Sequence, residues 1–129
     1  MFGGALGTVS DCSSTEGCSD ELLKLDAHEQ QWTEITVNGP RPLARFGHTM
    51  VSVEYTHSLF VFGGATHLGL AKDLWTLDTV SMEWTLLDHD LPTCEPRPNA
   101  RERHCMASVG ASRSSCTEAA DDDSVGVHL

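Results

Sequence analysis

Hydrophobic residues in this chain fall into short runs of strand length, with turn residues between them. Residues 49–55 (TMVSVEY) alternate between two faces, and residues 59–62 are continuously apolar, which is typical of a short strand buried on both sides. Residues 74–77 and 84–87 are rich in aromatic and aliphatic side chains, which favour strands. No window has helical periodicity. The pattern predicts an all-β protein.

The same strand pattern occurs twice along the chain. Four runs recur in the same order: MFGG at 1–4 as VFGG at 61–64, LLKLD at 22–26 as LWTLD at 74–78, QWTEI at 31–35 as EWTLL at 83–87, and ARFGHTM at 44–50 as ARERHCM at 100–106. Unequal loops account for the different spacings. Four strands in a unit of about 50 residues are typical of one blade of a β-propeller.

These repeats resemble kelch repeats over about residues 1–109. The matching residues are Arg45, Gly47, His48, Phe62, Gly63, Gly64, Asp73, Leu74, Trp75, Leu77, Asp78 and Trp84, with Gly3, Gly4, Leu25, Asp26 and Trp32 in the earlier copy. The resemblance implies an incomplete kelch β-propeller with four-stranded antiparallel blades. It also implies that each glycine pair ends the second strand of a blade, where the adjacent blade approaches closely, because glycine has no Cβ. Trp32 and Trp84 would fill the space between blades.

The repeat divides the chain into four segments. They are 1–37, the C-terminal part of one blade; 38–88, a complete blade; 89–109, a linker and the first strand of a further blade; and 110–129, a disordered acidic tail. Closed propellers typically have 4–8 blades. We therefore expect a fragment or truncated form of a larger scaffold or adaptor, whose open strand edges could cause self-association.

Charge and cysteine content narrow the function classes. The chain has 19 acidic and 8 basic residues, a net charge of −11, which argues against a nucleic-acid surface. No apolar run has the length of a membrane-spanning helix. The five cysteines form no CxxC pair and no zinc-finger spacing, so we expect mostly free thiols, a reducing compartment and a cytoplasmic location.

The sequence offers no convincing catalytic, cofactor or metal site. A copper-radical oxidase site resembling that of galactose oxidase uses several tyrosines, and this chain has only Tyr55. Neither GxSxG nor GxxxxGK[ST] is present. His48 and His104 stand at the histidine position of the repeat, which predicts a structural role at a blade junction. We expect no enzyme; the alternative is the propeller portion of a multidomain enzyme, methyltransferase-like or oxidase-like, with its catalytic residues outside this chain.

The kelch resemblance implies a protein–protein interaction module that docks partners on loops at one face. Those loops are 38–45, 65–72 and 88–103. The candidate contact residues are Arg41, Arg45, His67, Leu68, Arg101 and Arg103. Because arginine binds carboxylates in a bidentate manner, an acidic peptide is one partner that would suit these loops. Arg45 and Arg101 occupy equivalent repeat positions, and their alternative role is to tie blades together.

Overall fold

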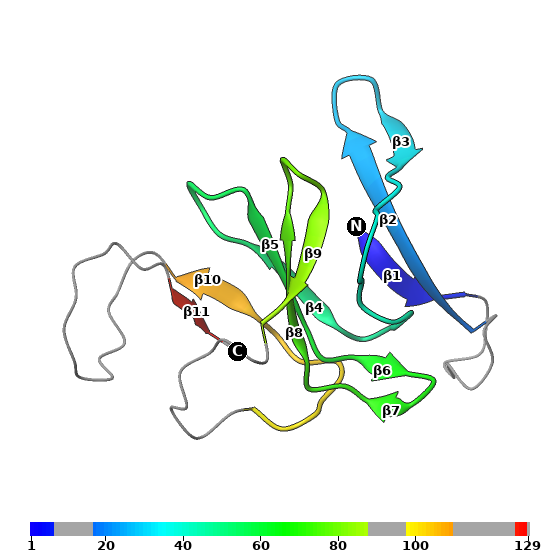
Figure 1. Cartoon of the computed structure of the whole chain (residues 1–129), viewed down its shortest axis with the longest axis vertical. Helices are drawn as coiled ribbons and strands as arrows, with labels where there is room; N and C mark the ends of the chain where they lie inside the picture. The colour runs from blue at the N-terminus through cyan, green and yellow to red at the C-terminus, as the bar shows by residue number, and fades with distance from the viewer. Residues whose placement is uncertain (7–16, 88–97, 110–125, 129) are drawn as a thin grey trace.

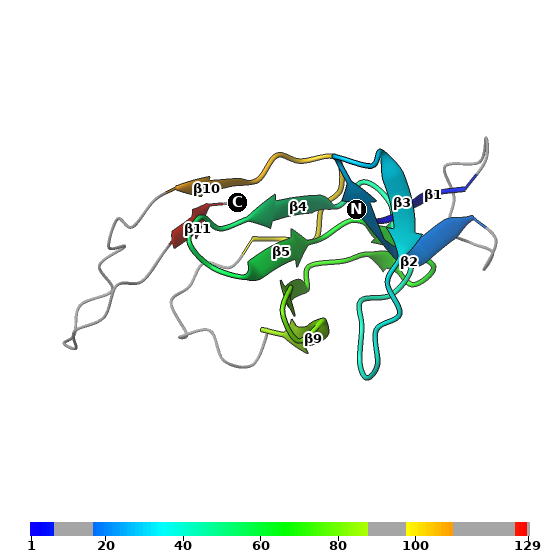
Figure 2. The same ribbon diagram turned by 90° about the horizontal axis from the view of Figure 1, so that it is seen from above.

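The computed structural model describes residues 1–6, 17–87, 98–109 and 126–128. Within these ranges every regular element is a β-strand, and all strand pairs are antiparallel. Three sheets follow one another across the molecule, from β1–β3 through the central sheet to β10–β11 (Figures 1 and 2). The all-β prediction is confirmed. None of the described residues forms a helix that could cross a membrane.

The central sheet is a four-stranded meander. Its strands, in spatial order, are β4 (Thr49–Ser52), β5 (Ser58–Phe62), β8 (Leu74–Asp78) and β9 (Glu83–Leu86). The last three agree with the predicted strands to within one residue. The predicted strand over 49–55 is wrong in its second half, because β4 ends at Ser52 and Tyr55 lies in the turn, with a positive φ of 62° and a fully exposed side chain.

The first sheet repeats three of these four strands. It contains β1 (Phe2–Ala5), β2 (Cys18–Asp26) and β3 (Gln31–Glu34), in that order. The registers of the two copies agree: Leu25 pairs with Trp32 across β2 and β3, and Leu77 pairs with Trp84 across β8 and β9. The repeat seen in the sequence is therefore a repeat of hydrogen-bonded geometry.

Two further pairs of strands complete the described chain. The loop at 65–72 contains a short hairpin, β6 (Ala65–Thr66) and β7 (Gly69–Leu70), which the sequence pattern does not predict. Strand β10 (Ala107–Val109) pairs with β11 (Gly126–His128), as β4 pairs with β5. The segment predicted to be a disordered tail thus includes a strand at its end, and residues 110–125 lie outside the described residues.

The hydrophobic core joins the first two sheets. Val61 and Leu77 are almost completely buried, and Phe2 of β1 packs against Trp84 of β9 with ring centroids 5.1 Å apart. Trp84 is 4% exposed, so its predicted core position is confirmed. The same prediction for Trp32 is wrong, since its side chain is 52% exposed and no described aromatic ring covers it as Phe2 covers Trp84.

The cysteines correct one expectation from the sequence. Cys18 is buried and disulfide-bonded, whereas Cys105 is a free, exposed thiol. Cys12, Cys94 and Cys116 lie outside the described residues. Cys18 is therefore an exception to the expectation of mostly free thiols, and Cys105 agrees with it. Disulfide formation depends on the distance between Cβ atoms in space, which the spacing of cysteines along the chain does not reveal.

Candidate partner-binding site

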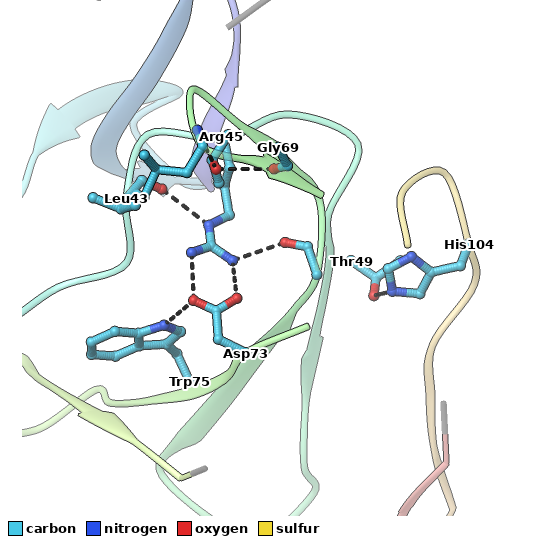
Figure 3. Close-up of polar contacts among 10 residues, drawn as sticks. Leu43, Arg45, Thr49, Gly69, Asp73, Trp75 and His104 are labelled. Carbon is cyan, nitrogen blue, oxygen red and sulfur yellow. Dashed lines mark hydrogen bonds and ion pairs between the residues drawn. The ribbon is translucent and has the colours of Figure 1, made fainter. Parts of the chain in front are cut away.

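Arg45 organises the end of the central sheet at which the connecting loops meet (Figure 3). Its Nη1 and Nη2 donate to the two carboxylate oxygens of Asp73 at 2.7 and 2.8 Å. Nη1 also donates to the Gly63 carbonyl at 2.8 Å, and Nε donates to the Leu43 carbonyl at 3.0 Å. The Arg45 side chain thus connects the incoming loop, the end of β5 and the residue before β8.

Asp73 is held ionised by its neighbours. Burial alone would raise the pKa of its carboxyl group, but the hydrogen bonds and positive charge of Arg45 and the indole N–H of Trp75 outweigh burial and leave the pKa lowered. The Trp75 indole Nε1 donates to Asp73 Oδ2 at 2.7 Å. Arg45 and Trp75 therefore both hold the Asp73 carboxylate in place.

This arrangement corrects the role predicted for Arg45. Arg45 is 0% exposed. Its guanidinium is hydrogen-bonded to Leu43, Gly63 and Asp73, which belong to the same repeat unit. Arg45 is therefore not available to a partner. Arg45 contacts the preceding sheet through its backbone and not through its side chain. The Arg45 carbonyl accepts a hydrogen bond from the Gly4 N–H at 2.9 Å.

The glycine pairs lie where this backbone contact is made, as predicted. The Gly64 N–H donates to the Arg101 carbonyl at 2.8 Å, which repeats the bond between Gly4 and Arg45. Gly3 and Gly63 have φ values of 64° and 65°. A Cβ on Gly63 would lie 2.6 Å from the Arg101 carbonyl oxygen, so no side chain fits there.

His48 and His104 occupy equivalent places beside the glycine pairs. Their rings contact Phe2 and Phe62, with centroids 5.7 and 5.4 Å apart. His104 Nε2 also lies 2.8 Å from Thr49 Oγ1 (Figure 3). Burial lowers the pKa of both imidazoles, and the nearby positive charges of Arg45 and Arg101 lower them further. These contacts are those of a structural residue between adjacent sheets.

His67 and Leu68 lie at the exposed tip of the β6–β7 hairpin. The hairpin is anchored at its base by two backbone hydrogen bonds between Phe46 and Ala65, at 2.8 and 3.1 Å. Thr66 Oγ1 stabilises the tip by accepting the Leu68 N–H at 3.1 Å. The Leu68 side chain is 77% exposed. A fixed backbone therefore presents an apolar side chain to solvent.

Two further exposed leucines were not predicted as contact residues. Leu70 in β7 is 54% exposed, and Leu43 in the loop before Arg45 is 43% exposed. Both leucines are apolar residues inside predicted loops, and this feature of the sequence could have identified them as candidate contact residues.

The remaining candidate arginines lie on the connections between sheets. Arg41 Nη2 forms an ion pair with Asp20 Oδ2 at 2.9 Å, and both side chains are exposed. Arg101 Nε donates to the Asn99 carbonyl at 3.0 Å. Arg103 is exposed, and its backbone N–H donates to the Gly47 carbonyl at 2.7 Å. Exposed ion pairs contribute little stability, so Arg41 can exchange Asp20 for another carboxylate at small cost.

Comparison with known proteins gives the family. The KLHDC2/KLHL20/DRC7 Kelch-repeats domain matches residues 1–113. The chain belongs to the kelch-repeat family. The four-stranded sheet is one kelch blade, and its Arg45, Gly63 and Asp73 contacts belong to the architecture of that blade.

Several kelch proteins are similar to this chain over part of its length. Kelch domain-containing protein 3 of Bos taurus is 34% identical over 77 residues, covering 58% of this chain and 20% of the relative. Kelch domain-containing protein 10 of Rattus norvegicus is 35% identical over 81 residues, covering 63% and 19%. Multiple epidermal growth factor-like domains protein 8 of Mus musculus is 31% identical over 106 residues, covering 79% and 4%. The chain spans a fifth or less of these relatives.

The described part of this kelch chain contains no cluster of potential metal ligands. No group of three or more His, Cys, Asp or Glu side chains there is placed to hold a metal ion. The surface features of the site are instead the anchored hairpin, its exposed leucines and the arginines of the connections.

Proposed function

We propose that this chain is a protein–protein interaction module that docks its partner on the end of the kelch blade where the β6–β7 hairpin and the connection before Arg45 meet. The observation that carries the proposal is Leu68, which is 77% exposed on a hairpin anchored at Phe46 and Ala65. A rigid support with an exposed apolar tip loses little conformational entropy on binding. The kelch family, in which many partners share one fold, supports the same function class.

The test is a matched pair of substitutions. Leu68→Asp places a charge at the hairpin tip, whereas Val80→Asp places one in the β8–β9 turn, where Val80 is 71% exposed. We expect Leu68→Asp to reduce capture of the partner from cell extract at least tenfold by quantitative mass spectrometry, and Val80→Asp to leave it unchanged. Equal capture by both variants and the parent chain would refute the proposed surface.

An acidic peptide segment is the partner chemistry that we propose for the connections. The exposed ion pair of Arg41 with Asp20 supports this choice, because it is a carboxylate contact of the required kind. Arg103 is exposed on the next connection. Arg103→Glu should weaken binding of the captured partner, whereas Lys24→Glu, on the exposed part of β2, should not. Unchanged affinity after Arg103→Glu would count against an acidic partner.

We further propose that the module acts within a larger cytoplasmic scaffold or adaptor. Its span of a fifth or less of its relatives supports the larger parent, and the free thiol of Cys105 suits a reducing compartment, whereas the disulfide of Cys18 does not. Fractionation of cells, followed by immunoblotting for size, tests both points.

Self-association through an open strand edge is a second binding mode that we propose. In the described chain β3 pairs only with β2 and β9 pairs only with β8, so the other edge of each of these outer strands can accept a strand. Sedimentation velocity of the 129-residue chain should show larger species as its concentration rises. A single monomeric species at every concentration would contradict this mode.

A further inference from the structure

Asn38 and Gly39 form an exposed Asn-Gly pair in the connection between the first sheet and the central blade. Gly39 has a φ of 92°, and an added Cβ would meet no atom within 4 Å, so the space beside its peptide group is open. In the described chain neither the Asn38 side chain nor the Gly39 N–H takes part in a hydrogen bond. The side-chain amide and the backbone nitrogen that follows it are therefore both free to react.

These two groups can react with each other. The backbone nitrogen of Gly39 attacks the side-chain carbonyl carbon of Asn38, and a new carbon–nitrogen bond forms. The bond from that carbon to the side-chain nitrogen breaks, and this nitrogen leaves as ammonia with the proton of the Gly39 N–H. Water then opens the resulting cyclic imide to aspartate or isoaspartate, with no oxidant or reductant. A glycine at the second position favours the attack, because it has no Cβ to obstruct it.

The second asparagine of the chain provides an internal comparison. Asparagine occurs only at positions 38 and 99. Asn99 is also exposed, but Ala100 follows it, and its carbonyl accepts the Arg101 Nε–H at 3.0 Å. The Cβ of Ala100 stands beside the nitrogen that would have to attack. The two asparagines thus share their exposure and differ in the residue that follows.

Anchors on both sides of the Asn-Gly pair confine the effect of the reaction to a short span. Before the pair Val37 packs against the core, and after it the side chain of Pro42 is fully buried. Between these anchors Arg41 carries its exposed ion pair with Asp20. Aspartate adds a negative charge to this span, and isoaspartate also adds a carbon atom to its main chain. Either product therefore changes the surroundings of Arg41 while the anchors stay in place.

We propose that Asn38 is a site of spontaneous deamidation, and that the new carboxylate lowers the affinity of the connection around Arg41 for an acidic partner. The effect on binding rests on the proposed acidic partner, because a carboxylate three residues before Arg41 in the chain repels such a partner. The modification itself depends only on Asn38 and Gly39.

Mass spectrometry of the ageing chain tests the modification. The 129-residue chain is incubated in mildly alkaline buffer, and the peptides that contain Asn38 and Asn99 are compared over time. We expect conversion at Asn38 to be about tenfold or more faster than at Asn99, and Gly39→Ala should remove the difference. The folded chain should convert Asn38 about as fast as the chain unfolded in urea, because the fold leaves the pair open. Equal conversion of both asparagines, or protection of Asn38 in the folded chain, overturns the proposal.

Binding of a glutamate peptide tests the consequence. Asn38→Asp reproduces the new charge, and Gln30→Glu adds the same charge at an exposed position in the β2–β3 turn. The probe is the peptide acetyl-Gly-Glu-Glu-Glu-Gly-amide. Asn38→Asp should weaken its binding about threefold or more, whereas Gln30→Glu should leave it unchanged.

The outcomes separate the two parts of the proposal. Equal weakening by Asn38→Asp and Gln30→Glu would reduce the effect to overall charge and overturn the effect on binding. A parent chain that does not bind the glutamate peptide would refute the acidic partner and, with it, the effect on binding. In either case the mass measurement decides on its own whether Asn38 is modified.

Discussion

Arg45 and Asp73, 28 residues apart in the chain, are joined by two parallel hydrogen bonds of 2.7 and 2.8 Å. The arginine side chain is 0% exposed and the aspartate side chain is 25% exposed. This ion pair fastens the connection that precedes β4 to the residue that precedes β8, and it fixes the base from which the β6–β7 hairpin projects.

Removal of Asp73 should therefore destabilise the fold strongly. Asp73→Ala leaves the Arg45 guanidinium buried without a counter-ion, and we expect a loss of about 3 kcal/mol in the free energy of unfolding. The double variant Arg45→Met with Asp73→Leu should lose less than Asp73→Ala alone, because no buried charge remains. Denaturant unfolding measures both.

A control for this prediction is Asp78→Ala. Asp78 is exposed, and its side-chain Oδ1 accepts the backbone N–H groups of Val80 and Ser81 at 2.7 and 3.0 Å. We expect a much smaller loss of stability there, because only hydrogen bonds within an exposed turn are removed. If Asp73→Ala were no more costly than Asp78→Ala, the ion pair would have no structural importance.

Gly63 should tolerate no side chain. Gly63→Ala would bring a Cβ to 2.6 Å from the Arg101 carbonyl oxygen, so the backbone contact between the central blade and the next unit must open. Gly39 also has a positive φ, of 92°, but a Cβ there meets no atom within 4 Å. We expect Gly39→Ala to cost about 1–2 kcal/mol from its φ alone, and Gly63→Ala about 3 kcal/mol or more. Equal losses in thermal unfolding would mean that the close approach is unimportant.

Stability should fall when the solution becomes mildly acidic. The pKa values of His48 and His104 are lowered from the ordinary 6.5 by burial, so the folded chain holds the neutral rings in preference to the charged ones. The unfolded chain binds protons first as the pH falls through about 6.5, and the free energy of unfolding decreases. Above that pH the two imidazoles are neutral in both the folded and the unfolded chain, and their contribution to the free energy of unfolding is fully present.

The pH prediction is checked by urea unfolding at about pH 7.5 and about pH 5.5. His48→Asn should make the difference between the two pH values smaller, because one buried imidazole is gone. His57→Asn, at an exposed turn position, should leave the difference as it is in the parent chain. A parent chain whose stability rises on acidification would contradict the assignment.

Sequence reasoning captured the parts of the fold that repeat. The recurrence of Gly-Gly, LxLD and Trp predicted β5, β8 and β9, and it placed Gly63 where the next unit presses close. It did not predict β6 and β7, since two-residue strands have no periodicity to detect. It also could not tell the environments of Trp32 and Trp84 apart, because a neighbour such as Phe2 approaches only in space.

The candidate site was predicted less well than the fold. Arg41, Arg45 and Arg101 all lie in connections between strands. In the folded chain Arg45 is buried against Asp73, whereas Arg41 is exposed and paired with Asp20. Composition and spacing do not show whether the side chain of an arginine in a connection points into the protein or into solvent. His67 and Leu68 were placed correctly in an exposed loop, and their role in binding stays a prediction.

The central claim, that partners dock on the anchored hairpin, is tested most directly by amide hydrogen exchange of the chain with and without its captured partner. We predict slower exchange at residues 65–72 on binding, with no change at residues 79–82 in the β8–β9 turn. Protection confined to residues 79–82, with residues 65–72 unaffected, would contradict the claim.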